Sequence, residues 1–195
     1  MKKKKTIKIR ENITDVEYQK LLIYLNGKEN LTTNTKNNLK RTFILLFYTG
    51  MRINEVKQLR VRDIDTIIKK EELIIVTHKT RKERKLFFSK EAIKQIKKHF
   101  LFSDDGKDND YIITVKGNPL KTPSSSTYIS SVNKFIQEIL GHRYSSHSFR
   151  SGIITDMSKS INPKFIKEFI GHSDIKTTMR YIRPTDEDLK KCLIR

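Results

Sequence analysis

The sequence contains one cysteine, Cys192, so no disulfide can form within the chain and a reducing compartment suits it. Its longest apolar stretch covers residues 43–48, far short of the roughly 20 residues of a membrane-spanning helix. The lysines at positions 2–5 are not followed by the apolar segment of a signal peptide. These absences predict a cytoplasmic protein that has no membrane partner.

Acidic residues are few compared with basic ones: 22 Asp and Glu stand against 41 Lys and Arg, a formal net charge of +19. The excess lies mainly in residues 1–100, which hold 26 basic and 11 acidic residues. A charge this large opposes compaction unless a polyanion is the usual partner, and lysine and arginine displace counterions from DNA phosphates. A nucleic acid is therefore the predicted partner, and a solvated, lysine-rich surface is the alternative.

The chain also lacks internal repeats and long linkers, and its 195 residues suit one compact domain, with or without a small appendage. That length is sufficient to bury an apolar core without a metal or a disulfide. We expect a flexible basic arm over residues 1–13, one domain over residues 14–195, and a short tail at about 184–195.

Turn residues and apolar periodicity predict an α+β fold that is mainly helical and carries a small antiparallel hairpin. The segments 73–77 and 85–88 are rich in β-branched and aromatic residues, and they flank a charged turn at 78–84. The acidic segment 104–110 is interpreted as a solvated loop, because its spacing does not match a calcium-binding loop. Helices are expected at about 15–25, 36–48, 90–102, 126–140, 148–160, 163–170 and 175–181, with short ones through Val56 and Leu59 and after Thr185.

The first motif that carries chemistry is Thr49-Gly50-Met51-Arg52-Ile53-Asn54-Glu55. A glycine turn before a helix places Arg52 at the helix N-terminus, where backbone N–H groups also face an anion. Glu55 follows one helical turn later and is placed to hold the Arg52 guanidinium. Taken alone, such a pair is more often a surface ion pair.

Two further motifs contain histidines. In His147-Ser148-Phe149-Arg150, the first and last residues share a helical face, so an imidazole and a guanidinium can converge on one phosphate. The alternative is a capped helix start with two incidental polar groups. The other motif is Gly171-His172-Ser173, and Tyr181 lies nine residues after His172. Taken alone, Tyr181 would be interpreted as a packing residue near a helix end.

Together these segments, from about Thr14 to Tyr181, resemble the tyrosine recombinase (phage integrase) family, and the size is similar to that of single-domain members such as fimbrial invertases. The resemblance implies the catalytic-domain fold of these DNA breaking-rejoining enzymes, with Tyr181 as nucleophile and Glu55 as a supporting residue. It also implies a lysine in the hairpin turn, for which Lys79 fits best and Lys82 is the alternative. The implied catalytic set is Arg52, Lys79, His147, Arg150, His172 and Tyr181, and the basic residues Arg81, Lys82 and Arg84 are expected to contact DNA.

The reaction implied by this resemblance is attack of the tyrosine on a phosphodiester, which leaves a 3′-phosphotyrosyl enzyme and a free 5′-hydroxyl. A 5′-hydroxyl from a partner strand then reverses the step, so neither a cofactor nor a metal is expected. Arg52 and Arg150 would neutralise the non-bridging oxygens. His147 would assist deprotonation of the phenol, Lys79 would protonate the leaving oxygen, and His172 would donate a hydrogen bond.

Two departures from the family pattern stand out. Ser151 occupies a position where most members carry a second histidine after the His-x-x-Arg pair. The chain also shows no counterpart of the separate N-terminal domain with which most members close around DNA, so an accessory DNA-binding protein is a candidate partner. The resemblance implies a homotetramer on DNA, with a monomer in solution as a second state.

Alternatives from other classes remain open at this point. A type IB topoisomerase shares the phosphate chemistry but relaxes supercoils as a monomer, and a DNA-binding protein with a vestigial site would not cleave. A two-metal nuclease would need magnesium. For a recombinase, the outcome is integration, excision, inversion or dimer resolution, typical of mobile genetic elements.

The tail after Tyr181 is predicted to pack either on its own domain or into a neighbouring protomer. If it packs into a neighbour, deleting the residues after Arg183 should abolish synapsis of two DNA sites yet spare cleavage of a nicked site. Native gels of DNA complexes and a cleavage assay measure the two effects. Loss of both activities together would instead favour packing within one domain.

Overall fold

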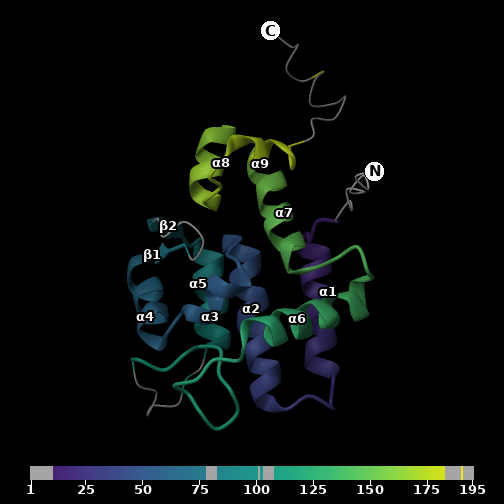
Figure 1. Cartoon of the computed structure of the whole chain (residues 1–195), viewed down its shortest axis with the longest axis vertical. Coiled ribbons are helices and arrows are strands. Elements are labelled where there is room, and N and C mark those ends of the chain that lie inside the picture. Colours follow the sequence, from purple (N-terminus) through teal and green to yellow (C-terminus); the bar gives the residue numbers. More distant parts are fainter. Residues whose placement is uncertain (1–10, 78–82, 101, 103–107, 183–189, 191–195) are drawn as a thin grey trace, which may run out of the picture.

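The computed structural model describes residues 11–77, 83–100, 102, 108–182 and 190. It is mainly helical with one two-stranded antiparallel sheet, which confirms the predicted fold class (Figure 1). No helix within these ranges is long and apolar enough to span a bilayer. The elements are α1 Asp15–Gly27, α2 Thr33–Thr49, α3 Ile53–Gln58, α4 Val61–Lys70, β1 Glu72–Val76, β2 Glu83–Phe87, α5 Lys90–His99, α6 Ser125–Leu140, α7 Ser146–Ser158, α8 Pro163–Ile170 and α9 Ile175–Met179.

Most helix boundaries predicted from the sequence lie within a few residues of the observed ones, but α4 was not predicted. Its buried residues Val61, Ile64 and Ile67 recur every three positions, while Asp63 caps the start by accepting from the Arg60 N–H at 2.8 Å. The period of three was therefore a sequence signal for a further helix after α3. The tail helix expected after Thr185 lies outside the described residues, apart from Lys190.

The main core is built around α2, which contacts α1, α3, α5 and α7. Four consecutive α2 residues, Phe43 to Leu46, are completely buried, so this helix is apolar on all sides at its centre. Phe43 stacks on Phe149 of α7 with ring centroids 5.8 Å apart. The core thereby joins α2, whose C-terminus begins the first motif, to α7, which carries the second.

The helices α8 and α9 form a separate unit beyond the end of α7, with β2 beside α8 (Figure 1). They pack on a small core of their own, in which Ile154, Ile166 and Ile170 are completely buried. Tyr181 and Ile182 pack against this cluster. The third motif therefore lies on a unit that shares little apolar surface with the main core.

Residues 11–13 belong to the folded body, which corrects the predicted boundary of the flexible arm. Ile13 is 2% exposed, and its N–H donates to the Ser148 carbonyl at 3.1 Å. Asn12 accepts from the Ser151 hydroxyl at 2.6 Å and donates to Thr155 at 3.1 Å. The serine that departs from the family pattern thus anchors the incoming chain on α7.

The close packing of residues 11–13 on α7 requires a glycine in that helix. A Cβ on Gly152 would clash with the Ile13 carbonyl oxygen, whereas a Cβ on Gly27 would meet nothing within 4 Å. Gly152→Ala should therefore lower the free energy of unfolding by roughly 1–3 kcal/mol, as overpacking does. Gly27→Ala is the control and should be neutral or stabilising by up to about 1 kcal/mol. Urea titrations measure both values, and equal stabilities for the two variants would contradict this account.

Candidate active site

The site begins where α2 ends. Gly50 adopts a left-handed conformation (φ 61°) and donates its N–H to the Leu46 carbonyl, which terminates the helix. A Cβ there would lie 3.0 Å from side-chain carbons of Ile153 and Ile170, so glycine is needed for space as well as for φ. The turn delivers Arg52 to the start of α3.

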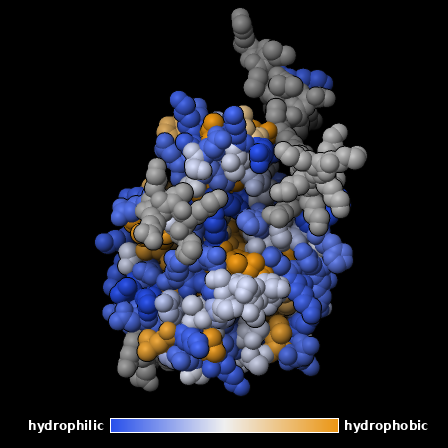
Figure 2. Space-filling view, in the orientation of Figure 1, coloured by the Kyte–Doolittle hydropathy of each residue, from blue (hydrophilic) through white to orange (hydrophobic). Residues whose placement is uncertain are grey.

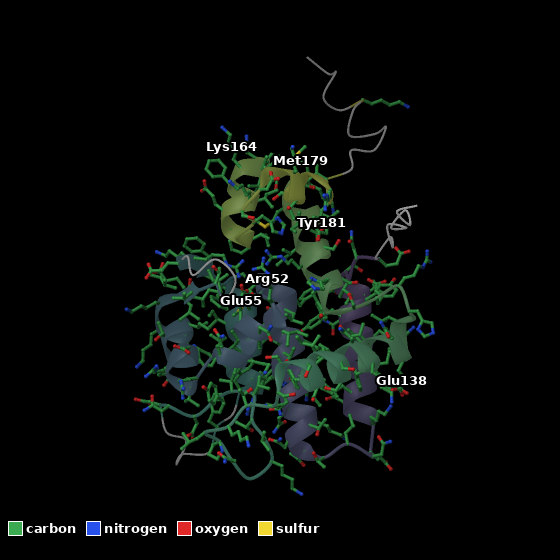
Figure 3. The ribbon with its side chains drawn as sticks, viewed as in Figure 1. Arg52, Glu55, Glu138, Lys164, Met179 and Tyr181 are labelled. Carbon is green, nitrogen blue, oxygen red and sulfur yellow. The ribbon has the colours of Figure 1, made fainter. Side chains whose placement is uncertain are left out.

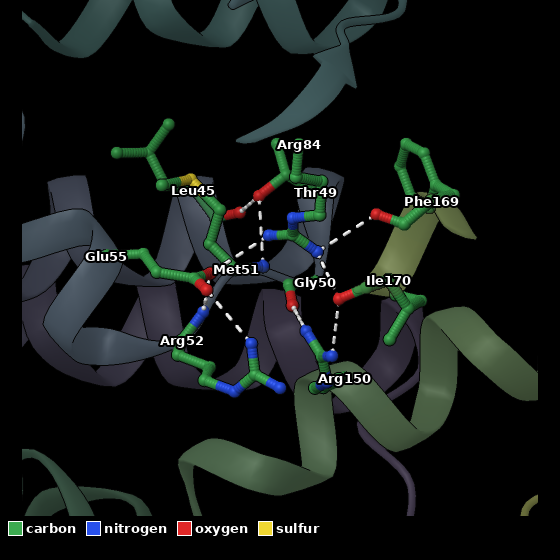
Figure 4. Close-up of polar contacts among 10 residues, drawn as sticks. All are labelled: Leu45, Thr49, Gly50, Met51, Arg52, Glu55, Arg84, Arg150, Phe169 and Ile170. Atoms are coloured by element: carbon green, nitrogen blue, oxygen red, sulfur yellow. Dashed lines mark hydrogen bonds and ion pairs between the residues drawn. The ribbon is translucent and has the colours of Figure 1, made fainter. Parts of the chain in front are cut away.

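Glu55 is the carboxylate at the centre of the site, and its side chain is 2% exposed. Its Oε1 accepts from Arg52 Nη1 at 2.9 Å, and its Oε2 accepts from the Arg52 backbone N–H at 2.8 Å (Figure 4). The same Oε2 accepts from Arg84 Nη2 at 2.9 Å. Glu55 therefore fixes the guanidinium of Arg52, whose side chain remains 36% exposed on its outer side.

Arg150 projects from α7 into the same region and is 4% exposed. Its Nη1 donates to the Gly50 carbonyl at 2.8 Å and its Nη2 to the Ile170 carbonyl at 2.5 Å (Figure 4). Burial, together with the nearby charges of Arg52 and Arg84, lowers the pKa of Arg150 to about 9. The guanidinium is still charged at neutral pH, and an anion next to it would be strongly stabilised.

Arg52 and Arg150 line one cavity of about 210 Å³ together with the exposed His147. Its other walls are Met51, Ile53, Asn54, Ile129 and Ser146. In Figure 2, hydrophilic residues occupy the recess between the α8–α9 unit and the rest of the molecule. Two cations and an imidazole thus converge on a space that can admit a phosphate group.

A larger cavity of about 490 Å³ lies away from these residues, between the start of α2 and α6. Two of its polar residues are engaged with each other and with Thr114: the Asn38 amide donates to the Thr114 carbonyl, and the Tyr128 hydroxyl donates to the Asn38 carbonyl. Its cations are Lys28, Lys116 and Lys134, and no residue of the three motifs lines it, so it is not the candidate site.

His172 follows Gly171, which ends α8 in a left-handed conformation (φ 74°). Its Nδ1 lies 2.9 Å from the Thr178 hydroxyl of α9. Burial and the charges of Arg150, Arg52 and Arg84 lower the pKa of His172 to about 4. The imidazole is therefore neutral at physiological pH, so it can act by hydrogen bonding but carries no charge of its own.

Tyr181 is half-buried just after α9, with its ring centroid 6.2 Å from that of His172 and the two planes 19° apart. Its N–H donates to the Thr178 carbonyl at 3.0 Å. Tyr181 is also close enough to Arg150 to interact with its charge. Figure 3 shows Tyr181 beside α9 and above Arg52 in this view.

The structure places five predicted residues in two groups: Arg52, His147 and Arg150 line one cavity, and His172 stacks on Tyr181 in the α8–α9 unit, outside the lining of that cavity. The supporting residue Glu55 contacts Arg52 directly. The hairpin-turn residues Lys79, Arg81 and Lys82 lie outside the described residues.

The expectation that Arg84 contacts DNA is wrong for this structure, because its side chain is 3% exposed and paired with Glu55. In the sequence, Arg84 directly follows the charged residues of the turn, Arg81, Lys82 and Glu83. The available signal was its position in β2, where Arg84 and Leu86 point to the same buried face and Arg84 lies opposite Ile75.

The family model of the phage integrase family matches residues 11–188. The chain belongs to the phage integrase family. It is 27% identical to tyrosine recombinase XerA of Thermococcus onnurineus over 158 residues, which cover 80% of this chain and 55% of that relative. It is 28% identical to tyrosine recombinase XerC of Treponema denticola over 169 residues, or 76% and 52% of the two chains. The chain spans about half the length of these relatives.

Solved structures of integrase-family proteins share the fold. The crystal structure of XerA recombinase matches with a TM-score of 0.67 and 16% identity, over 98% of this chain and 65% of that one. The Tn1549 transposon integrase in complex with circular intermediate DNA matches with a TM-score of 0.66 and 17% identity, over 93% and 66%. The catalytic domain of bacteriophage HP1 integrase matches over 95% of both chains, with a TM-score of 0.56 and 16% identity.

The lowered pKa of His172 makes stability depend on pH in a defined direction. The unfolded chain takes up a proton on this histidine near pH 6.5, whereas the folded chain does so only near pH 4. Because the unfolded state binds more protons between these values, the free energy of unfolding falls as the pH drops from 6.5 to 4. Urea titrations across this range should show a shallower fall for His172→Gln than for the wild type, and identical slopes would contradict the assignment.

Proposed function

We propose that this chain is a site-specific DNA recombinase that cuts and rejoins DNA through a covalent 3′-phosphotyrosine intermediate. The observation that carries the proposal is the convergence of Arg52, His147 and Arg150 on one cavity, with Tyr181 stacked on His172 in the α8–α9 unit. Three arginines surround the single buried carboxylate of Glu55, so the site holds excess positive charge. A phosphodiester supplies the anion that this charge favours.

The proposed mechanism assigns each side chain a step. Tyr181 attacks the phosphorus and the 5′-oxygen leaves, so the phosphodiester is exchanged for a phosphotyrosyl ester. Arg52 and Arg150 stabilise the charge that builds on the non-bridging oxygens. His147, which lines the same cavity, takes the phenolic proton, and neutral His172 hydrogen-bonds the phosphate. Lys79, or Lys82 in its place, protonates the leaving oxygen.

We propose double-stranded DNA as the partner and a homotetramer on DNA as the active assembly, with an accessory DNA-binding protein as a further partner. The net charge of +19 and the integrase-family membership support the DNA partner. The integrase of transposon Tn1549, one structural neighbour, has been solved in complex with circular intermediate DNA. The outcome of recombination is a separate property that depends on the arrangement of the DNA sites.

The covalent step is testable without knowing the target site. A pool of labelled, nicked duplexes with a randomised central segment is incubated with the protein, and adducts that survive detergent are sequenced. The wild type should form a DNA adduct whose peptide contains phosphorylated Tyr181. Tyr181→Phe should form none, because it lacks the attacking oxygen but keeps the ring that packs against α8.

Three controls separate the alternatives. Adduct formation in EDTA excludes a two-metal nuclease, whereas dependence on magnesium would contradict the proposal. Holliday junctions formed from two copies of the selected site distinguish a recombinase from a topoisomerase, which would only relax supercoils. DNA binding without any adduct in wild type and Tyr181→Phe alike would favour a vestigial site.

A further inference from the structure

Arg84 is a buried cation that the mechanism above does not use. It projects from the inward face of β2, and the whole residue is 5% exposed. Desolvation lowers its pKa, although Glu55 acts in the opposite direction. Because burying a guanidinium is costly, its position must be maintained by strong polar contacts.

Those contacts join three separate elements. Arg84 Nη2 donates to Glu55 Oε2 in α3 at 2.9 Å, and Nη1 donates to the Phe169 carbonyl at 2.9 Å and to the Ile170 carbonyl (Figure 4). Both carbonyls belong to the last turn of α8, where a helix leaves its carbonyl groups without intrahelical partners. The guanidinium group of Arg84 in β2 therefore connects the start of α3 with the end of α8 through hydrogen bonds.

Arg84 shares two of its three acceptors with the arginines of the cavity. Glu55 also accepts from Arg52, and the Ile170 carbonyl also accepts from Arg150 Nη2 at 2.5 Å. The aliphatic part of Arg84 covers Gly171, where a Cβ would lie 2.9 Å from Arg84 Cδ. Arg84 is thus adjacent to the groups that orient Arg52 and Arg150 and to the residue before His172.

We propose that Arg84 is a positioning residue that holds the α8–α9 unit, with His172 and Tyr181, at its working distance from Arg52 and Arg150. The inference rests on the proposed recombinase function. The unit has only a small apolar core of its own, so polar contacts have a large share in placing it. A lysine cannot replace Arg84, because one ammonium group cannot reproduce a planar fork that serves a carboxylate and two carbonyls. With a side chain 3% exposed, Arg84 acts through these groups and does not touch DNA.

The test compares Arg84→Lys with a matched control, Lys85→Met. Lys85 is the next residue, points to the opposite face and makes a half-exposed ion pair with Glu72. The substrate is the nicked duplex selected with the wild type. Arg84→Lys should slow single-turnover adduct formation at saturating DNA by about 100-fold, the effect of misplacing reacting groups. Its DNA affinity should stay within about twofold of the wild-type value at each salt concentration. Lys85→Met should keep the wild-type rate at saturating DNA.

Two results would overturn the proposal. An unchanged rate would show that Arg84 does not position the reacting groups. DNA binding weakened by more than about tenfold would show that the guanidinium contacts a phosphate directly, because a lysine keeps the charge but cannot reproduce the planar fork. If Arg84→Lys does not fold, Arg84→Gln replaces it, because a neutral amide is less costly to bury than an ammonium group and still cannot serve the carboxylate and the two carbonyls together. Adduct formation at saturating DNA should again be slower while the DNA affinity stays unchanged. An unchanged rate of adduct formation would again overturn the positioning role of Arg84.

Hydrogen exchange provides a readout that needs no reaction. The amides of residues 169–176 should exchange faster in Arg84→Lys than in the wild type or Lys85→Met, because the end of α8 loses its tether. Equal protection in all three proteins would overturn the positioning role even if the wild type formed no adduct. Absence of a wild-type adduct together with faster exchange in Arg84→Lys would instead overturn only the recombinase function.

Discussion

The candidate site depends on the buried carboxylate of Glu55. Arg52 and Arg84 bind it at 2.9 Å each, and its charge also opposes the lowering of the Arg150 pKa that burial causes. Without this carboxylate, three guanidinium groups would repel one another in a region from which water is largely excluded. Removing one partner of a buried ion pair typically costs about 3–5 kcal/mol. The remaining excess of positive charge is what makes the site receptive to a phosphate.

Two helix ends form the second layer of the site. The helices α2 and α8 both terminate in a left-handed glycine, Gly50 and Gly171, and both present carbonyl oxygens to arginines. Arg150 bridges the two ends by donating to the Gly50 and Ile170 carbonyls. The negative ends of two helix dipoles therefore face the cations and help to keep them charged. The same glycines allow the close approach of neighbouring side chains.

The α8–α9 unit, beside which Tyr181 lies, rests on a much smaller apolar core than the rest of the fold. The main core packs continuously around α2, whereas α8 and α9 rest on a cluster with three completely buried isoleucines. The two parts are linked through α7 and through the arginine-to-carbonyl bonds. Because the α8–α9 unit makes few apolar contacts with the main core, its position depends on these polar contacts.

Much of this protein could be predicted from short stretches of sequence. The apolar periodicity of α1, α2, α6 and α8 marked those helices to within a few residues, and the β-branched segments marked the hairpin. The motif residues Arg52, His147, Arg150, His172 and Tyr181 were found because each stands in a distinctive local pattern. The α4 helix, which was not predicted, also has a local signal, since its buried residues Val61, Ile64 and Ile67 recur every three positions.

The sequence by itself determined the helices, the family and the main site residues, since helix periodicity, capping and motif spacing depend on neighbours along the chain. Only the tertiary structure decided where Arg84 lies and that residues 11–13 dock on α7. Both depend on partners far away in sequence, with Phe169 lying 85 positions from Arg84 and Thr155 lying 143 from Asn12. A basic residue after a basic turn resembles a solvated one until the carboxylate and carbonyls that compensate its burial are brought to it by folding.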